Sequence, residues 1–128
     1  MTIEEKVYAV LAAAAGVTVL ATAGRIKPPG DWQSLARPYI VHFPVTAESI
    51  QMHGTPGLAT LKMWRYQISC FADTYSGARS LAVAMRLAIG DYKADGIVTH
   101  WLSDYDIPFE SDIRVIQIVS EFEIADML

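Results

Sequence analysis

Two alternations of different period adjoin in the middle of the chain, and together they predict a strand followed directly by a helix. Apolar residues occupy every second position over residues 64–70, the period of a half-buried strand. Over residues 78–89 they recur every three or four positions, as on one face of a helix. Asp73 and Thr74 lie between the two segments, where a side-chain oxygen can cap the helix. We expect Gly90 to end the helix in a left-handed conformation.

The inner faces of these two segments and of a final alternating segment predict one hydrophobic core. The final segment covers residues 112–124 and has the period of a strand. Both of its faces are apolar near its start, which indicates that the second face of the sheet is also covered. The residues expected in the core are Trp64, Tyr66, Ile68, Leu81, Met85, Ile116, Ile118 and Phe122.

The predicted helix also carries two apolar residues on the side away from its core stripe. At about 100° per residue, Val83 and Leu87 lie opposite the stripe and four positions apart. Isolated apolar residues are common on protein surfaces, so the pair can belong to an ordinary solvated face. Alternatively, the helix is contacted on both sides, by its own sheet and by another subunit.

The N-terminal part of the chain predicts a helix, a short turn and a short strand. Thr2 and Glu5 have the spacing of a capping box, and the apolar period after them predicts a helix over residues 3–15. Gly16 is expected to end this helix. Residues 17–22 then predict a further helical turn, and residues 25–27 predict a short strand.

A strand, a long connection and a second strand precede the central helix. Residues 38–45 alternate, but Pro44 cannot donate to a ladder, so the strand is an edge strand or has a bulge there. Residues 46–58 are rich in Gly, Pro, Thr and Ser and predict a long hairpin arm or loop. Strands are expected over residues 59–71 and, after the helix, over residues 97–105.

These elements predict one α+β domain over residues 1–128. The expected fold is an antiparallel sheet of about four strands with two main helices packed on one face and a long hairpin loop. Hydrophobic residues make up 52% and charged residues 19% of the chain. That composition is apolar for a small domain, which indicates that some apolar surface is covered at an interface.

The net charge of −4 is unevenly distributed along the chain. Residues 1–64 carry five basic and four acidic residues, whereas residues 65–128 carry five and ten. The chain has no basic stripe, which argues against sequence-independent binding of nucleic acid through its phosphates. The acidic excess favours a basic protein partner instead.

Side chains typical of catalytic or metal sites are sparse and lack the necessary spacing. Cys70 is the only cysteine and alternates in phase with the core, so we expect a small buried residue. The three histidines lack metal-type spacing, and the acidic residues between 104 and 112 predict a solvated hairpin turn. Residues 54–57 predict a turn rather than a phosphate loop. No apolar run is long enough to span a membrane. We therefore expect a cytoplasmic product that is not an enzyme and has no cofactor or metal.

A series of short motifs runs through the central part of the chain. They are a Gly-x-x-Gly-Leu turn, a strand ending in Gln-Ile-x-Cys-x-Ala, then Thr-Tyr-x-x-Ala-Arg and an Ala/Leu-rich helix. The residues of these motifs are Gly54, Gly57, Leu58, Gln67, Ile68, Cys70, Ala72, Thr74, Tyr75, Ala78 and Arg79. In these motifs the chain resembles the tail completion, or tail terminator, family of tailed phages and prophages. The Ala-rich N-terminal helix and the segment of residues 38–41 also fit.

The resemblance implies a virion structural protein made in the cytoplasm of the bacterial host. Such proteins assemble as a ring, typically a hexamer, at the head-proximal end of the tail, and gene transfer agents use similar proteins. The ring stops polymerisation of the tail tube protein and joins the tail to the head connector or head completion protein, with DNA only passing through its lumen. The alternative is a small cytosolic α+β ligand-binding module or enzyme subunit, with its ligand between sheet and helices.

Two surfaces are expected to make the contacts of such a ring. The first pairs the back of the central helix with the second sheet face, where acidic residues meet arginines across the contact. Its residues are Arg79, Val83, Arg86, Leu87, Val115, Gln117, Val119, Glu121 and Glu123. The second is a partner-binding loop made of Gln51, Met52, His53, Gly54, Pro56 and Gly57. The segment 51–53 replaces the acidic residue that the family usually has before Gly54.

Overall fold

The protein is described by a computed structural model that covers residues 2–27, 37–51, 60–94, 96–107 and 115–127. Six strands form one sheet in the order β1-β2-β3-β6-β5-β4. The β1–β2 pair is parallel, and every other neighbouring pair is antiparallel. The strands are β1 Ile26–Lys27, β2 Tyr39–Gln51, β3 Thr60–Ala72, β4 Lys93–Ala94, β5 Ile97–Ile107 and β6 Ile116–Met127.

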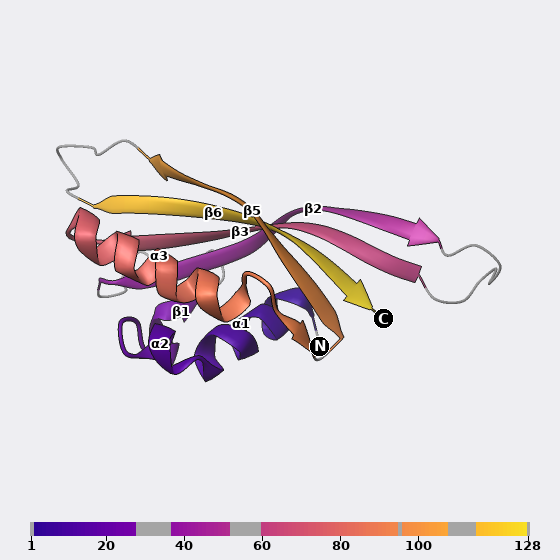
Figure 1. Ribbon diagram of the computed structural model, residues 1–128, viewed down its shortest axis with the longest axis horizontal. Helices are drawn as coiled ribbons and strands as arrows, with labels where there is room; N and C mark the ends of the chain where they lie inside the picture. Colours follow the sequence, from indigo (N-terminus) through magenta and orange to yellow (C-terminus); the bar gives the residue numbers. More distant parts are fainter. Residues whose placement is uncertain (1, 28–36, 52–59, 95, 108–114, 128) are drawn as a thin grey trace.

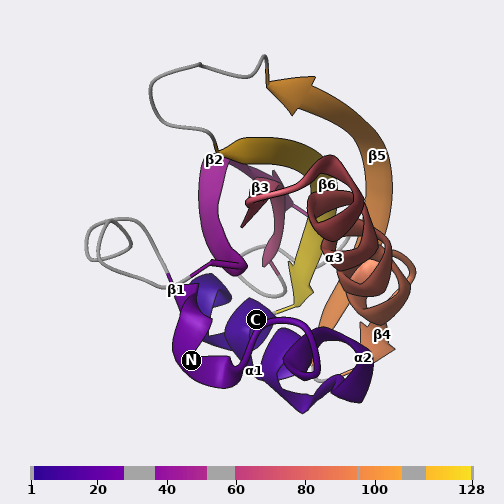
Figure 2. The same ribbon diagram turned by 90° about the vertical axis from the view of Figure 1, so that its left-hand side faces the viewer.

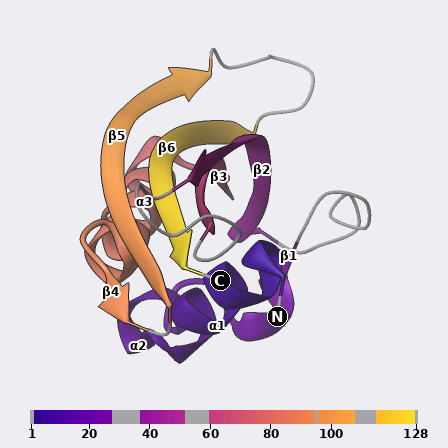
Figure 3. The same ribbon diagram turned by 90° about the vertical axis from the view of Figure 1, so that its right-hand side faces the viewer.

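The helices cover one side of this sheet (Figure 1). They are α1 Ile3–Ala13, α2 Ala15–Thr18 and α3 Tyr75–Ile89, with a 3-10 turn, η1, at Ala23–Arg25. Helix α1 packs on β1 and β2, α3 packs on β3 and β6, and α2 contacts α3. Figures 2 and 3 show that the sheet is strongly curved, with α3 beside β6 and α1 near β1.

The expected α+β class is confirmed, as are the two main helices on one face. The four long strands β2, β3, β6 and β5 pair with one another in antiparallel fashion, as predicted. The prediction of about four strands was too low, because the two-residue strands β1 and β4 extend the sheet at its edges. Since β1 runs parallel to β2, the sheet is mixed rather than wholly antiparallel.

The core forms between the helices and the inner face of the sheet. Six of the eight residues predicted for it are fully buried there: Tyr66, Ile68, Leu81, Met85, Ile118 and Phe122. Trp64 and Ile116 are partly buried and pack against the same cluster. The alternation in β3 and β6 and the helical period in α3 therefore have the predicted phase.

Threonine hydroxyls cap the two main helices. Thr2 accepts a hydrogen bond from the backbone N–H of Glu5 at 3.2 Å, and Thr74 accepts one from Gly77 at 3.0 Å. Thr74 rather than Asp73 is thus the cap of α3, because the Asp73 carboxylate pairs with Arg37 at 2.6 Å.

Two of the predicted helix ends were wrong. Helix α1 ends before Ala14, which is extended, and Gly16 lies inside α2 rather than ending a helix. Gly90 is right-handed, with φ −58° and ψ −38°, so it does not form a left-handed cap. A Cβ atom at Gly90 would lie 2.5 Å from the Arg86 carbonyl oxygen, so glycine permits a close backbone approach there instead. Among the described glycines, Gly96 has the left-handed backbone, with a φ of 80°.

The β2–β3 hairpin extends beyond the helices as an arm, which is visible in Figure 1. Strand β2 continues to Gln51, which pairs with Thr60. The predicted hairpin arm is therefore confirmed over residues 46–51, and the rest of the segment expected as a loop lies outside the described residues. The register shifts between Pro44 and Thr46, which confirms the bulge predicted at this proline.

Candidate functional site

The outer face of α3 presents a row of residues that the core does not use. Leu87 is 82% exposed and Val83 is 38% exposed, as their position opposite the core stripe predicted. Arg79 lies one turn before Val83, is also exposed, and makes no ion pair with another described residue. These three side chains, spaced four residues apart, are called the α3 ridge below.

Arg86, also predicted for the interface, is held within its own chain. Its Nη1 atom lies 3.3 Å from Oδ2 of Asp104, and its guanidinium lies 4.9 Å from the centre of the Trp101 ring. The Asp104 carboxylate also accepts hydrogen bonds from Trp101 Nε1 at 2.9 Å and from the Ser120 hydroxyl at 2.6 Å. Arg86 therefore fastens α3 to β5, which leaves Arg79 as the cation of the ridge.

The position of Asp104 differs from the one predicted. The acidic residues from 104 onward were predicted to form a solvated turn, but Asp104 lies within β5 and its side chain is only 14% exposed. Its partners Arg86 and Ser120 come from α3 and β6, so the sequence around Asp104 does not reveal them.

The second sheet face is covered near the start of β6, largely by the chain itself. Val119 is 1% exposed and therefore packs within its own chain rather than presenting a side chain to another copy. Gln117 is half-buried and donates a hydrogen bond to the Ser69 hydroxyl at 3.3 Å. Tyr39 stacks on Phe71 on the neighbouring strands, with ring centres 4.7 Å apart. Val115 is half-buried just before β6 begins.

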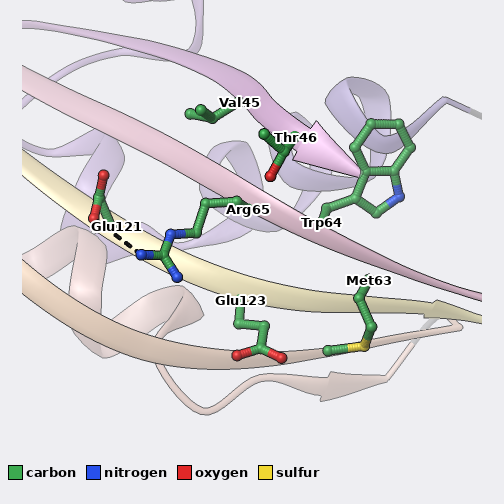
Figure 4. A pocket seen from close by; sticks show the side chains of 7 residues that line it. All are labelled: Val45, Thr46, Met63, Trp64, Arg65, Glu121 and Glu123. Carbon is green, nitrogen blue, oxygen red and sulfur yellow. Dashed lines mark ion pairs between the residues drawn. The ribbon is translucent and has the colours of Figure 1, made fainter. Parts of the chain in front are cut away.

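Glu121 and Glu123 lie further along this face, where it opens into a groove at the base of the arm (Figure 4). The groove has a volume of about 530 Å³. Strand β2 contributes Val45 at the bulge, and β3 contributes Arg65. The described residues that line the groove are Val45, Thr46, Met63, Trp64, Arg65, Glu121 and Glu123.

The charges in this groove are only partly balanced. Arg65 faces Glu121 in Figure 4, and the shortest distance between their charged atoms is 3.9 Å. Glu123 makes no ion pair within the described part of the chain. Trp64 Nε1 is buried beside the groove and finds no hydrogen-bond acceptor among the described residues. The groove thus offers one carboxylate, that of Glu123, which has no ionic partner among the described residues.

Five of the groove residues were not predicted as site residues: Val45, Thr46, Met63, Trp64 and Arg65. Pro44 is the sequence signal that indicates the position of the groove, because the bulge beside it lies at the base of the arm. The predicted partner-binding loop is represented by Gln51 alone, at the end of β2. Met52, His53, Gly54, Pro56 and Gly57 lie outside the described residues, so that site stays a prediction.

Buried titratable groups lie inside the fold rather than in either surface. His42 Nδ1 lies 2.5 Å from the Tyr66 hydroxyl, and burial lowers the pKa of His42 to about 4. Burial raises the pKa of the Cys70 thiol, which is buried as predicted. The described ranges contain no group of three or more His, Cys, Asp or Glu side chains placed to hold a metal ion. Within them, no helix has both the length and the apolar character needed to cross a bilayer.

Comparison with known proteins identifies the fold. Neither the protein-family models nor the curated proteins give a match to this chain. Among solved structures, the chain is similar to a chain of the "Virion of native gene transfer agent (GTA) particle", with a TM-score of 0.76. The two are 16% identical, and the match covers 98% of this chain and 95% of the other. The protein therefore has the fold of a chain found in a gene transfer agent virion.

Proposed function

We propose that this protein is a virion structural protein of a tailed phage or gene transfer agent, and that it acts as a tail terminator. The observation that carries the proposal is the shared fold with a virion chain over nearly the full length of both chains. The motifs around Thr74 and Arg79 support the same family independently of that fold. In this role the protein closes the tail tube and joins it to the head connector or head completion protein.

The working form in this proposal is a ring of identical subunits, typically six. A closed ring needs two different surfaces on each subunit, so that every copy meets the next in the same way. The α3 ridge and the groove at the base of the arm are two such surfaces. DNA passes through the lumen without being a specific ligand, in keeping with the acidic net charge of −4.

The alternative of a ligand-binding module or enzyme subunit needs room between the sheet and the helices. Between α3 and the sheet that space is filled by buried apolar side chains, among them Tyr66, Leu81, Met85 and Phe122. A hollow of about 450 Å³ does lie between α1 and the β1–β2 edge, and His42 is among the residues that line it. The shared fold with a virion chain favours the virion role over this alternative.

Particles produced without this protein test the proposed function directly. We expect unjoined heads and tails, with tails of uncontrolled length, when the gene is deleted in the host that makes the particle. Supplying the gene in trans should restore joined particles. Normal particles from the deletion strain would overturn the proposal. Electron microscopy of the concentrated, purified protein tests separately whether the ring forms without the tail.

A further inference from the structure

We propose that the groove at the base of the arm receives the α3 ridge of the next copy in the ring. This inference rests on the proposed ring and names the surfaces that close it. It moves the contact on the second sheet face away from Val119, which is buried, to the open end that carries Glu121 and Glu123.

The two surfaces lie on different faces of the subunit, as a head-to-tail contact allows. The ridge lies on the side of α3 away from the sheet, opposite the buried Leu81 and Met85. Arg65 and Glu123 alternate with the buried Tyr66 and Phe122, so they point to the sheet face that the helices leave open. A copy that places its ridge in a neighbour's groove keeps its own groove free for the next copy, so the contact repeats.

Apolar side chains are exposed on both surfaces. Leu87 projects from the ridge, and Val45 is exposed at the bulge on the groove side. Met63 is half-buried on the groove floor and can adapt its shape to an incoming side chain. The contact would remove the most exposed large apolar side chain of α3 from water.

The charges on the two surfaces are complementary. Arg79 makes no ion pair among the described residues, and Glu123 makes none either. The groove carries two carboxylates against the single Arg65 guanidinium, so it has a net negative charge. Pairing Arg79 of one copy with Glu123 of the next balances both charges and fixes the orientation of the contact.

Cysteine cross-linking tests the placement, because the native Cys70 is buried and contributes little background. A chain carrying both Leu87→Cys and Met63→Cys should form, on oxidation at high concentration, a ladder of disulfide-linked multimers that ends at the ring. Each single variant should stay uncross-linked, and a mixture of the two singles should give dimers only.

Two outcomes would overturn the placement. Dimers from Leu87→Cys alone would show that ridges meet each other. The absence of a ladder from the double variant, in solution or in joined particles where the wild type assembles only on tails, would show that ridge and groove do not meet. The mass of the wild type, measured by light scattering, tests the ring separately. The particles from the deletion strain test the proposed function separately.

A charge exchange tests the polar part of the contact. Arg79→Glu and Glu123→Arg should each raise the concentration needed for assembly by about tenfold, since each places like charges together. The combined variant should return to within about twofold of the wild type, because the pair is restored in reverse. Lys93→Glu, at an exposed position outside both surfaces, is the matched control. A combined variant that is weaker than either single would overturn the Arg79–Glu123 pairing.

Discussion

Lys6 ties the first helix to the last strand through a nearly buried ion pair. Its Nζ atom lies 2.5 Å from Oδ1 of Asp126, and the two side chains are only 15% and 6% exposed. Removing one partner of such a pair leaves the other charge buried and unpaired, which costs about 3–5 kcal/mol. We therefore expect Lys6→Met to lower the free energy of unfolding by that order in urea titrations.

The combined variant Lys6→Met with Asp126→Asn should be more stable than the sum of the single losses predicts, because no charge remains stranded. Lys93→Met removes an exposed lysine and serves as the control, with a change within about 0.5 kcal/mol. Strict additivity of the two single changes would show that the ion pair does not couple α1 to β6.

His42 makes stability depend on pH in a defined direction. Burial lowers the pKa of His42 from 6.5 to about 4, while the nearby Glu4 acts in the opposite direction. Between these two values the unfolded chain binds a proton that the native chain does not. Above pH 6.5, His42 therefore does not reduce the free energy of unfolding. As the pH falls from 6.5 toward 4, that free energy decreases by roughly 3 kcal/mol in all.

The measurement is the free energy of unfolding between pH 4 and 7. The glutamine amide of His42→Gln does not titrate. Subtracting the free energy of unfolding of this variant from that of the wild type therefore removes the pH dependence that the carboxylates give to both proteins. His100→Gln, at an exposed position, is the matched substitution outside the core. An equal slope in His42→Gln would show that His42 is not the group responsible.

At this scale the sequence predicts residues whose partners are close along the chain. Thr74 was recognisable as a cap because its hydrogen-bond donor, Gly77, is three positions away. Asp104 and Asp126 were not recognisable as buried, because the residues that neutralise them come from other elements. The ion pair of Arg86 with Asp104 was not recognisable for the same reason.

Helix α3 begins at a single side-chain cap, which makes its start sensitive to one substitution. The Thr74 hydroxyl satisfies the N–H of Gly77, and this first turn contains no acidic residue that could substitute for it. Thr74→Ala should cost about 1 kcal/mol in the free energy of unfolding, and Thr74→Ser should recover most of it. Ser76→Ala, at an exposed position of the same turn, is the control. Equal losses in both alanine variants would argue against the cap.

The strands show where periodicity succeeds and where it fails. Strands β3 and β6 alternate without interruption at their centres, so their inner faces were predicted in the correct phase. In β2 the bulge at Val45 shifts the register, and the polar residues after it resemble a loop in composition although they pair with β3. Gly90 was misread because glycine also permits a close backbone approach, which leaves no local signature in the sequence. Gly16 lies inside α2 in open space, so no close contact explains that error.

The β2 side of the arm has a neighbouring strand on one side only. Over residues 46–51, β2 pairs with β3 alone, whereas over residues 66–71 β3 lies between two strands. In the isolated subunit we expect amide hydrogens of residues 46–51 to exchange much faster than those of residues 66–71. In the assembled ring the arm should gain protection from a neighbour. Strong and equal protection in both states would contradict a role for the arm in assembly.

For the whole molecule, the fold determines which part of the predicted interface is open to another subunit, and the interface itself stays a prediction. The sequence shows that both the helix and the sheet have a second apolar side, which is a property of each element alone. Which part of that second side stays open depends on how the curved sheet covers itself. Val119 is buried whereas Glu123 borders an open groove, although both lie on the same face of β6.

The ridge itself provides the last prediction. Replacing Val83 and Leu87 together with Asp should leave the monomer folded, because neither residue belongs to the buried core. The same change should abolish the ring, because two carboxylates would be buried without partners beside Glu121 and Glu123. Circular dichroism measures the fold and light scattering the mass.

Val19→Asp is the matched control for that double variant. Val19 is as exposed as Leu87 but follows α2, away from the ridge, so its replacement should leave assembly unchanged. Where the wild type assembles only on tails, the comparison moves to particles, and the double variant should fail to rescue the deletion strain while Val19→Asp rescues it. A double variant that forms the wild-type ring, or that rescues joined particles, would place the contact on another surface. Because the ridge and the core stripe share one helix of 15 residues, the result separates folding from assembly within a single element.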